Sequence, residues 1–338
     1  MNFAAYVTRR TLFALLTVYL VLTATFAIVA FTPDTNKQAT IAQMERHGAS
    51  QEEINDFIEH YEAERGLDDS MAVRYADWLA DVTTLDFGQS TSMRAPVSEV
   101  LWPAIQRTAF YTIPAVLLAV LLGTLFGTIS GAFPNSTPDW VVRVGSYAAV
   151  GVPVFIAAFL VFWKLPLDFD WVNLLQWRGP PFYIMGRVTS PNSGLWPTWK
   201  PWRFLVPAAV FALSLIGWQL RYVRTAYLDR DGGELAKLHR AKGAGNLRVA
   251  RHVLRNAAVP IVSASLSELL VVVLLNIYVI ESVFGIEGLA AINMIAVRTR
   301  DMSLIIASSL ALALGGVLAS YVQDLLYGYL DPRIGAGT

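Results

Sequence analysis

The sequence predicts an all-α, polytopic membrane protein with six transmembrane helices. Of its 338 residues, 55% are hydrophobic and only 15% are charged, whereas typical soluble domains carry about 25% charged residues. The charges are also segregated, so that long stretches contain no Asp, Glu, Lys or Arg. About 20 apolar residues cross a bilayer as a helix. Because backbone polar groups in lipid must be paired within the segment, each stretch predicts a helix.

The uncharged stretches place these helices in order. They span residues 11–33, 108–138, 144–163, 204–220 and 302–323, and a sixth stretch, 256–280, contains only Glu268. We expect transmembrane helices at about 11–33, 108–132, 142–163, 204–223, 260–283 and 303–325. We end the second helix near residue 132, because its uncharged run of 31 residues is longer than one span and contains Pro114 and Pro134.

Basic residues predict the orientation, because Lys and Arg near span ends favour the cytoplasm. Arg9 and Arg10 precede the first predicted helix, and residues 221–255 carry nine Lys or Arg against three acids. We therefore expect residues 1–10 and the C-terminus in the cytoplasm. The segment 34–104, with 14 acids and five bases, is expected outside. Residues 105–338 then form the main transmembrane domain.

Short surface helices are expected within the outer segment 34–104. Ser50 followed by Glu53 is typical of a capping box at a helix start. A second short helix is expected over Met71 to Val82. We expect these helices to lie over the transmembrane helices rather than to form an independent domain.

Glycines repeat within the second predicted transmembrane helix. Gly123, Gly127 and Gly131 recur at every fourth residue, a spacing that places them on one helix face. Small residues on one face let helix backbones approach closely in membranes. We expect this row to pack against another helix.

A basic, glycine-broken segment, "HRAKGAGNLRVARHVLRNAAVP", lies between the fourth and fifth predicted helices. Residues 239–260 carry five Lys or Arg and no acid. Gly243 and Gly245 favour a break, because glycine adopts positive φ freely and is poor in helix interiors. We expect a helix to about Lys242, a sharp turn, and a second helix from Asn246, a candidate N-cap.

The second of these helices has two different faces. Three arginines follow a row that lines one side, while four apolar residues can face apolar neighbours. The arginines are Arg248, Arg251 and Arg255, and the apolar residues are Leu247, Val249, Val253 and Leu254. A cationic helix elbow suits a groove on another protein. The same composition also fits a basic loop that fixes topology and contacts anionic lipid.

Polar residues inside the fifth helix are the candidates for a solute path. Glu268 follows Pro260 by about 12 Å at 1.5 Å per residue. A charge at the bilayer centre costs at least about 2.5 kcal/mol, so this side chain should face protein or water. Ser265 and Asn276 can share its face, either as path lining or around a buried, paired acid. Glu281, at the outer end of the same helix, is a further candidate for the solute path. Alternatively, it is an acid at the helix end that has only a topological role.

The sequence lacks the motifs of an energy-converting or metal enzyme. It contains no cysteine, no G-x-x-x-x-G-K-[ST] phosphate loop and no H-E-x-x-H pattern. We therefore expect no cofactor, no metal site and no nucleic-acid partner. An intramembrane enzyme would need a His or Asp at the depth of Glu268, and none is found there.

Several motifs resemble the dipeptide/oligopeptide permease family of ABC importers, which also includes nickel and oligosaccharide transporters. "RYVRTAYLDRDGGELAKLHRAKG" at 221–243 resembles its cytoplasmic loop, and "RNAAVP", "IESVFGIEGL" and "YLDPRI" follow in its order. "GLDDS" and "WLADVTTLDFGQS" resemble its first outer loop. The chain departs from the family pattern at His239, where the family usually has Ala, and at Glu287, where it has Pro. The stretch "AFTPDT" also replaces an Arg-x-Ala-Pro-Gly-Asp stretch.

The resemblance implies the type I permease fold of ABC importers. Segment 224–258 would be the coupling loop that seats in a cytoplasmic ATPase. The residues that this assigns to coupling are Glu234, Arg240, Ala241, Lys242, Gly243, Asn246, Leu247 and Arg251. The implied partners are a second homologous permease, two ATPase subunits that bind ATP and Mg²⁺, an external substrate-binding protein and membrane lipid. The chain itself would not be an enzyme.

The solute and the energy source have alternatives. The resemblance implies inward transport of a small peptide or a similar polar solute across the plasma membrane. A self-sufficient secondary transporter would instead use Glu268 as an ion site and predicts inverted repeats with broken helices. No convincing inverted repeat is found in the sequence, and the basic elbow would then have no role.

Overall fold

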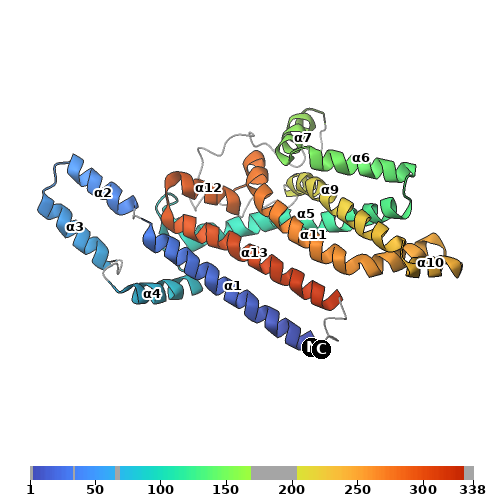
Figure 1. Cartoon of the computed structure of the whole chain (residues 1–338). Coiled ribbons are helices and arrows are strands. Elements are labelled where there is room, and N and C mark those ends of the chain that lie inside the picture. Colours follow the sequence, from blue (N-terminus) through green and yellow to red (C-terminus); the bar gives the residue numbers. More distant parts are fainter. Residues whose placement is uncertain (1–2, 33–34, 65–68, 169–203, 331–338) are drawn as a thin grey trace.

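The computed structural model describes residues 3–32, 35–64, 69–168 and 204–330, and this part is almost entirely helical (Figure 1). Its helices are α1 Phe3–Phe31, α2 Thr35–Arg46, α3 Gln51–Glu64, α4 Met71–Thr83, α5 Val97–Ala132, α6 Thr137–Gly151, α7 Val154–Asp168, α9 Leu205–Asp231, α10 Glu234–Ala241, α11 Asn246–Phe284, α12 Leu289–Thr299 and α13 Met302–Leu330. A small antiparallel hairpin, β1 Gln89–Ser90 and β2 Ala95–Pro96, precedes α5.

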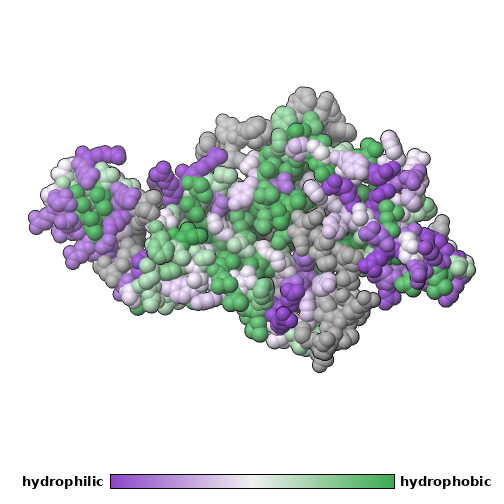
Figure 2. All heavy atoms as spheres, viewed as in Figure 1, coloured by the Kyte–Doolittle hydropathy of each residue, from purple (hydrophilic) through white to green (hydrophobic). Residues whose placement is uncertain are grey.

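The helices form a bundle of membrane-spanning length. Within the described residues, α1, α5, α9 and α13 are long and apolar enough to cross a bilayer. The total reaches six if each of two bent helix pairs counts as one span. Apolar residues occupy the middle of the molecule, and hydrophilic ones gather at the ends that carry α2–α3 and α10 (Figure 2). The predicted all-α, polytopic membrane fold is confirmed.

The third predicted span, 142–163, is two helices rather than one. α6 and α7 meet at an angle of 97°. The break falls at Val152, whose backbone is extended (φ −86°, ψ 113°), directly before Pro153. Proline removes a backbone donor and disfavours helical geometry at the preceding residue. The helix therefore bends within a run that is uncharged throughout.

The fifth predicted span, 260–283, belongs to a longer helix. α11 is a 39-residue helix that takes in much of the predicted loop 224–258, and α9 and α10 occupy most of the remainder. At its other end, Gly285 adopts a left-handed conformation (φ 62°). The unexpected α12 follows at an angle of 83° to the end of α11.

Helix α5 begins eleven residues before the predicted start at residue 108. Its early turns are buried, with Val97 and Ala104 each 0% exposed and Leu101 7% exposed. They pack against Leu289 of α12 and Leu304 of α13. Tertiary packing therefore extends this helix beyond the apolar run that predicts the span.

The predicted capping box in the outer segment is confirmed. The Ser50 amide donates to Glu53 Oε2 at 2.8 Å, and the Glu53 amide donates to Ser50 Oγ at 3.3 Å. α4 lies against α1, where Thr23 and Tyr75 share a hydrogen bond of 2.8 Å. α3, together with the unpredicted α2, instead projects away from the bundle (Figure 1). The expectation that the two predicted short helices lie over the transmembrane helices is therefore met by α4 and is wrong for α3.

The main core lies where α5, α9 and α11 meet. Tyr111, Phe211, Leu215 and Ile280 are each 0% exposed and belong to one apolar cluster. Residues from α7 and α12 complete it. The core thus joins α9, which precedes the basic segment in the sequence, to α11 and α12, which follow it.

The glycine row of α5 packs closely against another helix, as predicted, and that helix is α9. A Cβ added at Gly123 would lie 2.5 Å from Gln219 Cγ, and one at Gly127 would lie 2.7 Å from Val223 Cβ. At Gly131 it would lie 2.7 Å from Tyr227 Cδ1. These separations leave no room for a side chain, so the three glycines set the distance between the two helices.

We predict that Gly127→Val destabilises the bundle by about 1–3 kcal/mol, the usual cost of overpacking a core. The added side chain would also meet the rigid carbonyl oxygen of Leu220, 2.8 Å from the Cβ position. Thermal unfolding of the detergent-solubilised protein measures the effect. Gly145→Ala on α6 is the control, because nothing lies within 4 Å of its Cβ position. Equal melting temperatures for the two variants would contradict this packing.

Candidate functional site

The basic segment forms a helix elbow at one end of the molecule. α9 ends at Asp231, the short helix α10 covers Glu234–Ala241, and α11 begins at Asn246. We call α10, residues 242–245 and the first turns of α11 the elbow. The first turns of α1 and the last turns of α13 lie toward the same end, opposite α2 and α3 (Figure 1).

The predicted break at Gly243 is confirmed, and its hydrogen bonds explain it. Gly243 has φ +74°, its amide donates to Arg240 O at 2.9 Å, and the Ala244 amide donates to His239 O at 3.0 Å. This is the Schellman arrangement, in which a left-handed glycine closes the helix end. Asn246 is not the N-cap that we expected, because extended Gly245 (φ −66°, ψ 158°) occupies that position.

The inner side of the elbow is a small apolar core. Ala236 of α10 is 1% exposed and packs with Val249 and Val253 of α11 and with Tyr227 of α9, each at most 3% exposed. Arg240 adds an ion pair to Asp231, whose hydrogen bond raises the pKa of the guanidinium above its ordinary value. α10 is therefore held by both helices that flank it.

The outer side of the elbow exposes apolar and basic side chains together. The exposed residues include Glu234, Lys237, Arg240, Ala241, Lys242, Gly243, Arg248, Arg251 and Arg255. Among them lie Leu235, Leu238 and Leu247, which are 58%, 49% and 85% exposed. We expected Leu247 to face apolar neighbours within the chain, but it faces outward. We call these exposed residues the elbow surface.

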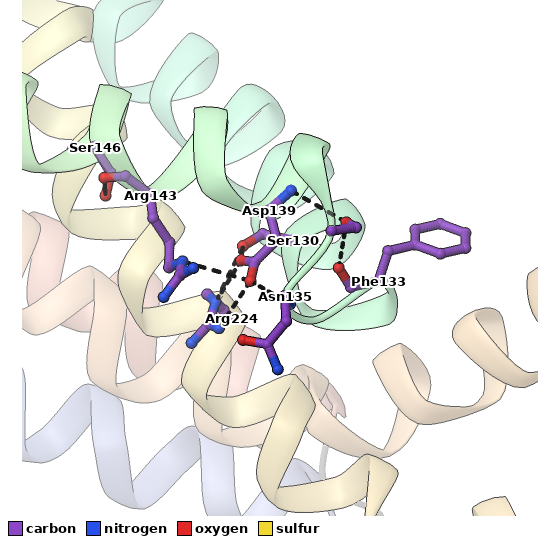
Figure 3. A network of polar contacts seen from close by, with 8 residues as sticks. Ser130, Phe133, Asn135, Asp139, Arg143, Ser146 and Arg224 are labelled. Atoms are coloured by element: carbon purple, nitrogen blue, oxygen red, sulfur yellow. Dashed lines mark hydrogen bonds and ion pairs between the residues drawn. The ribbon is translucent and has the colours of Figure 1, made fainter.

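A buried ion-pair network lies between α5, α6 and α9 (Figure 3). The Asp139 side chain is 0% exposed, and its Oδ1 accepts from Arg224 Nε at 3.0 Å. Ser130 Oγ donates to the same oxygen, and the Asn135 amide donates to Oδ2 at 2.8 Å. Arg143, one turn further along α6, lies 3.4 Å from Oδ2.

Sequence reasoning missed this network. Its local signal was present, because Ser136 and Asp139 have the spacing of a helix N-terminus, and the Asp139 amide does donate to Ser136 Oγ at 3.4 Å. The partner Arg224 is distant in the sequence, so only the fold brings it to the carboxylate. The result is a clamp that ties α9 to the α5–α6 turn.

A second buried carboxylate, Glu281, joins α5, α11 and α12. Its Oε1 accepts from Thr108 Oγ1 at 2.6 Å and from Tyr111 OH at 3.0 Å, and its Oε2 accepts from the Ala291 amide at 2.7 Å. The Glu281 side chain is fully buried. In this conformation it fixes the first turn of α12 and does not line an open path.

The other candidate path residues also lie on α11. Asn276 is half-buried and donates to Val272 O at 2.8 Å within its own helix. The backbones of Ser265 and Glu268 are helical, while their side chains lie outside the part of the chain that is described. A path along this helix face is therefore still a prediction.

A third buried carboxylate, Asp301, fastens the outer segment to the bundle and was not predicted. Its Oδ2 accepts from Ser90 Oγ at 2.6 Å, from Ser92 Oγ at 2.7 Å and from the Ser92 amide at 2.9 Å. Its Oδ1 accepts from the Leu304 amide at 3.2 Å, at the start of α13. Burial raises the pKa of Asp301, but these donors outweigh burial and hold it below its usual value.

This combination of apolar spans and bent helix pairs defines a multi-pass membrane protein, with exposed apolar and basic side chains on the elbow at one end. Residues 119–336, more than half of the chain, match the family described as binding-protein-dependent transport system inner membrane component. The chain belongs to this family, and it is a transport subunit of the plasma membrane. The predicted family resemblance is confirmed.

Individual relatives are similar over most of their length. The oligopeptide transport system permease protein AppB of Bacillus subtilis (strain 168) is 26% identical over 335 residues, covering 98% of this chain and 99% of the relative. The dipeptide transport system permease protein DppB of Alkalihalophilus pseudofirmus is 26% identical over 344 residues, with the same coverage. The glutathione transport system permease protein GsiC of Salmonella typhi is 26% identical over 270 residues, covering 80% and 81%.

We predict that Arg224→Gln destabilises the protein by on the order of 3 kcal/mol, because it leaves the buried Asp139 without its main partner. The double variant Arg224→Gln, Asp139→Asn should recover part of this loss. Thermal unfolding in detergent measures both variants. Arg230→Gln, at an exposed position of the same helix, is the control. An Arg224→Gln variant as stable as Arg230→Gln would show that the network is not a clamp.

We also predict that Asp301→Asn lowers the free energy of unfolding at neutral pH by about 1–3 kcal/mol. The hydroxyl and amide groups that donate to the charged carboxylate would lose their acceptor. The folded-state pKa of Asp301 lies below the ordinary value of 3.8, so its carboxylate stabilises the fold at higher pH. This contribution is lost as the pH falls from about 3.8 through the lower folded value. Melting temperatures of the two proteins should therefore converge in acid. A gap that widens below pH 4 would contradict this.

Proposed function

We propose that this chain is a permease subunit of an ABC importer that carries small peptides into the cell. It would pair with a second homologous permease, two cytoplasmic ATPase subunits and an external substrate-binding protein. The family membership supports the transport role, and the names of the relatives, which include oligopeptide, dipeptide and glutathione permeases, support a peptide solute.

The observation that carries the proposal is the elbow surface. Leu235, Leu238 and Leu247 are exposed among basic side chains, although burying one leucine gains about 1.5–3 kcal/mol. An exposed apolar patch rimmed by charges is typical of a protein–protein interface. The ATPase groove that receives it would present apolar pockets with an acidic rim.

The elbow is also built to transmit a displacement. α10 is held to α9 by the Arg240–Asp231 pair and to α11 by the buried contacts of Ala236. Both flanking helices continue into the bundle without interruption. A push on the elbow surface would move these helices as rigid bodies, the usual form of hinge and shear transitions.

The energy source would lie on the partner subunits. This sequence has no phosphate-binding loop, so ATP and Mg²⁺ would bind to the ATPases, and this chain would not be an enzyme. In this arrangement the elbow, the first turns of α1 and the last turns of α13 would lie in the cytoplasm. The segment with α2 and α3 would face the external binding protein.

The solute path would run beside α11. Glu268, Ser265 and Asn276 would line it on one helix face, since an intramembrane acid faces protein or water rather than lipid. Glu281 would stabilise the outer end of the path by holding α12 rather than by contacting the peptide.

We predict that Leu247→Asp weakens docking of the ATPase by about tenfold or more, because it replaces an exposed leucine that docking would bury. The fold should tolerate an acid there, since it lies in the first turn of α11, where the helix dipole favours negative charge. The amount of ATPase that co-purifies with the assembled transporter, and ATP-dependent peptide uptake in proteoliposomes, measure the effect.

Met71→Asp is the matched control, because Met71 is a 46% exposed apolar residue of α4, a helix that lies far from α10 (Figure 1). It should leave co-purification and uptake unchanged. Unaltered ATPase binding by Leu247→Asp would reject the elbow surface as the docking site. Peptide uptake by the chain without any ATPase would reject the ABC importer and favour an ion-coupled transporter.

A further inference from the structure

A cavity beside the first turns of α1 has no part in the networks described above. Its volume is about 480 Å³, and its lining includes Tyr6, Arg9, Arg10, Leu12, Phe13 and Leu16. Basic and aromatic side chains form one end, and apolar side chains form the other. The change falls where the uncharged run of α1 begins, at residue 11, which is the level of a membrane surface.

The two arginines at this end have different roles. Arg10 lies 3.2 Å from the Asp324 carboxylate on α13 and 5.5 Å from the ring centroid of Tyr6. Tyr6 in turn donates to Asp324 O at 2.9 Å, so this group ties α1 to α13. Arg9 is exposed and makes no ion pair with any residue in the described part of the chain. Its guanidinium is therefore available to an anion.

The side chains below Arg9 continue the same helix face. Leu12, Phe13 and Leu16 follow at helical spacing and are 61%, 60% and 52% exposed. From Arg9 to Leu16 the face extends about 10 Å along the helix axis, at 1.5 Å per residue. It thus presents a cation at the membrane surface and an apolar strip that runs into the bilayer.

We propose that this cavity binds an anionic phospholipid. Its phosphate would accept hydrogen bonds from Arg9, next to Arg10, which is already paired with Asp324. Its acyl chain would lie along Phe13 and Leu16. The guanidinium group suits this role, because its donors match phosphate oxygens in pairs. A lipid of net negative charge is favoured over a zwitterionic one, whose own cation would face the arginines.

The described lining of the site lies on α1, a helix at the edge of the bundle (Figure 1). Among the described elements, α1 packs mainly along α13, with a smaller contact to α4, and much of its apolar surface is exposed. A lipid held at Arg9 would add to the Arg10–Asp324 ion pair and the Tyr6 hydrogen bond that fasten this end of α1 to α13. The inference does not depend on which solute the protein transports or on its ATPase partners.

A thermal-shift titration of the detergent-solubilised, assembled transporter tests the site. The probes are dioctanoyl phosphatidylglycerol, dioctanoyl phosphatidylcholine and glycerol 3-phosphate. We expect saturable stabilisation by phosphatidylglycerol, a smaller shift with phosphatidylcholine and none with glycerol 3-phosphate. Arg9→Gln should weaken the apparent affinity for phosphatidylglycerol by about tenfold, from the loss of a charge-assisted hydrogen bond, and should weaken that for phosphatidylcholine, whose choline offsets its phosphate, by less.

Two further variants separate the charge from the apolar strip. Arg9→Lys keeps the charge and should retain most of the affinity, whereas Phe13→Ala should weaken binding of both lipids to a similar extent. Arg298→Gln is the control, an exposed arginine on α12 that should change nothing.

Three results would overturn the proposal. The first is that the protein binds the two lipids with equal affinity and that Arg9→Gln changes neither affinity. The second is stabilisation by glycerol 3-phosphate with the affinity of the lipid, which would indicate a site for a free anion. The third is loss of the second permease from the Arg9→Gln complex with unaltered lipid binding, which would make this face a protein interface.

Discussion

The contact between α5 and α9 is the constraint on which the rest of the structure depends. Gly127 and Gly131 allow the two backbones to approach so closely that an added Cβ would meet Val223 and Tyr227. At the elbow end of the same contact, the buried Asp139 accepts from Arg224. Close packing fixes the separation of α5 and α9, and the ion pair holds α9 against the start of α6, because a buried carboxylate that lost this partner would be strongly destabilising. α9 is therefore a rigid part of the bundle.

The elbow acquires its stiffness from this anchored helix. Tyr227 packs against α5 through Gly131 on one side and belongs to the apolar core under α10 on the other. The Arg240–Asp231 pair joins the end of α9 to the end of α10, and the left-handed Gly243 turns the chain into α11. A force on the exposed leucines would thus reach two long helices at once. This continuity explains how a small interface could control the whole bundle.

Uncharged runs predict helices only where lipid requires them. They located the membrane bundle, and local patterns found the capping box at Ser50 and the break at Gly243. They could not show that α9 and α11 extend beyond the bilayer, because amphipathic turns carry charges, nor that Pro153 bends one run into two helices. Asp139, Glu281 and Asp301 were missed as structural groups, because each has a main partner that is distant in the sequence. A single sequence reveals a charged residue but not the donor that the fold brings to it.

Site-specific cross-linking of the elbow tests the central claim most directly. The chain contains no cysteine, so a photo-reactive group on Leu247→Cys marks one position on the elbow surface. In the assembled transporter, the account predicts a covalent product with the ATPase subunit, whose yield changes when ATP and Mg²⁺ are added. A product formed only with lipid, or with a protein outside the cell, would contradict the account.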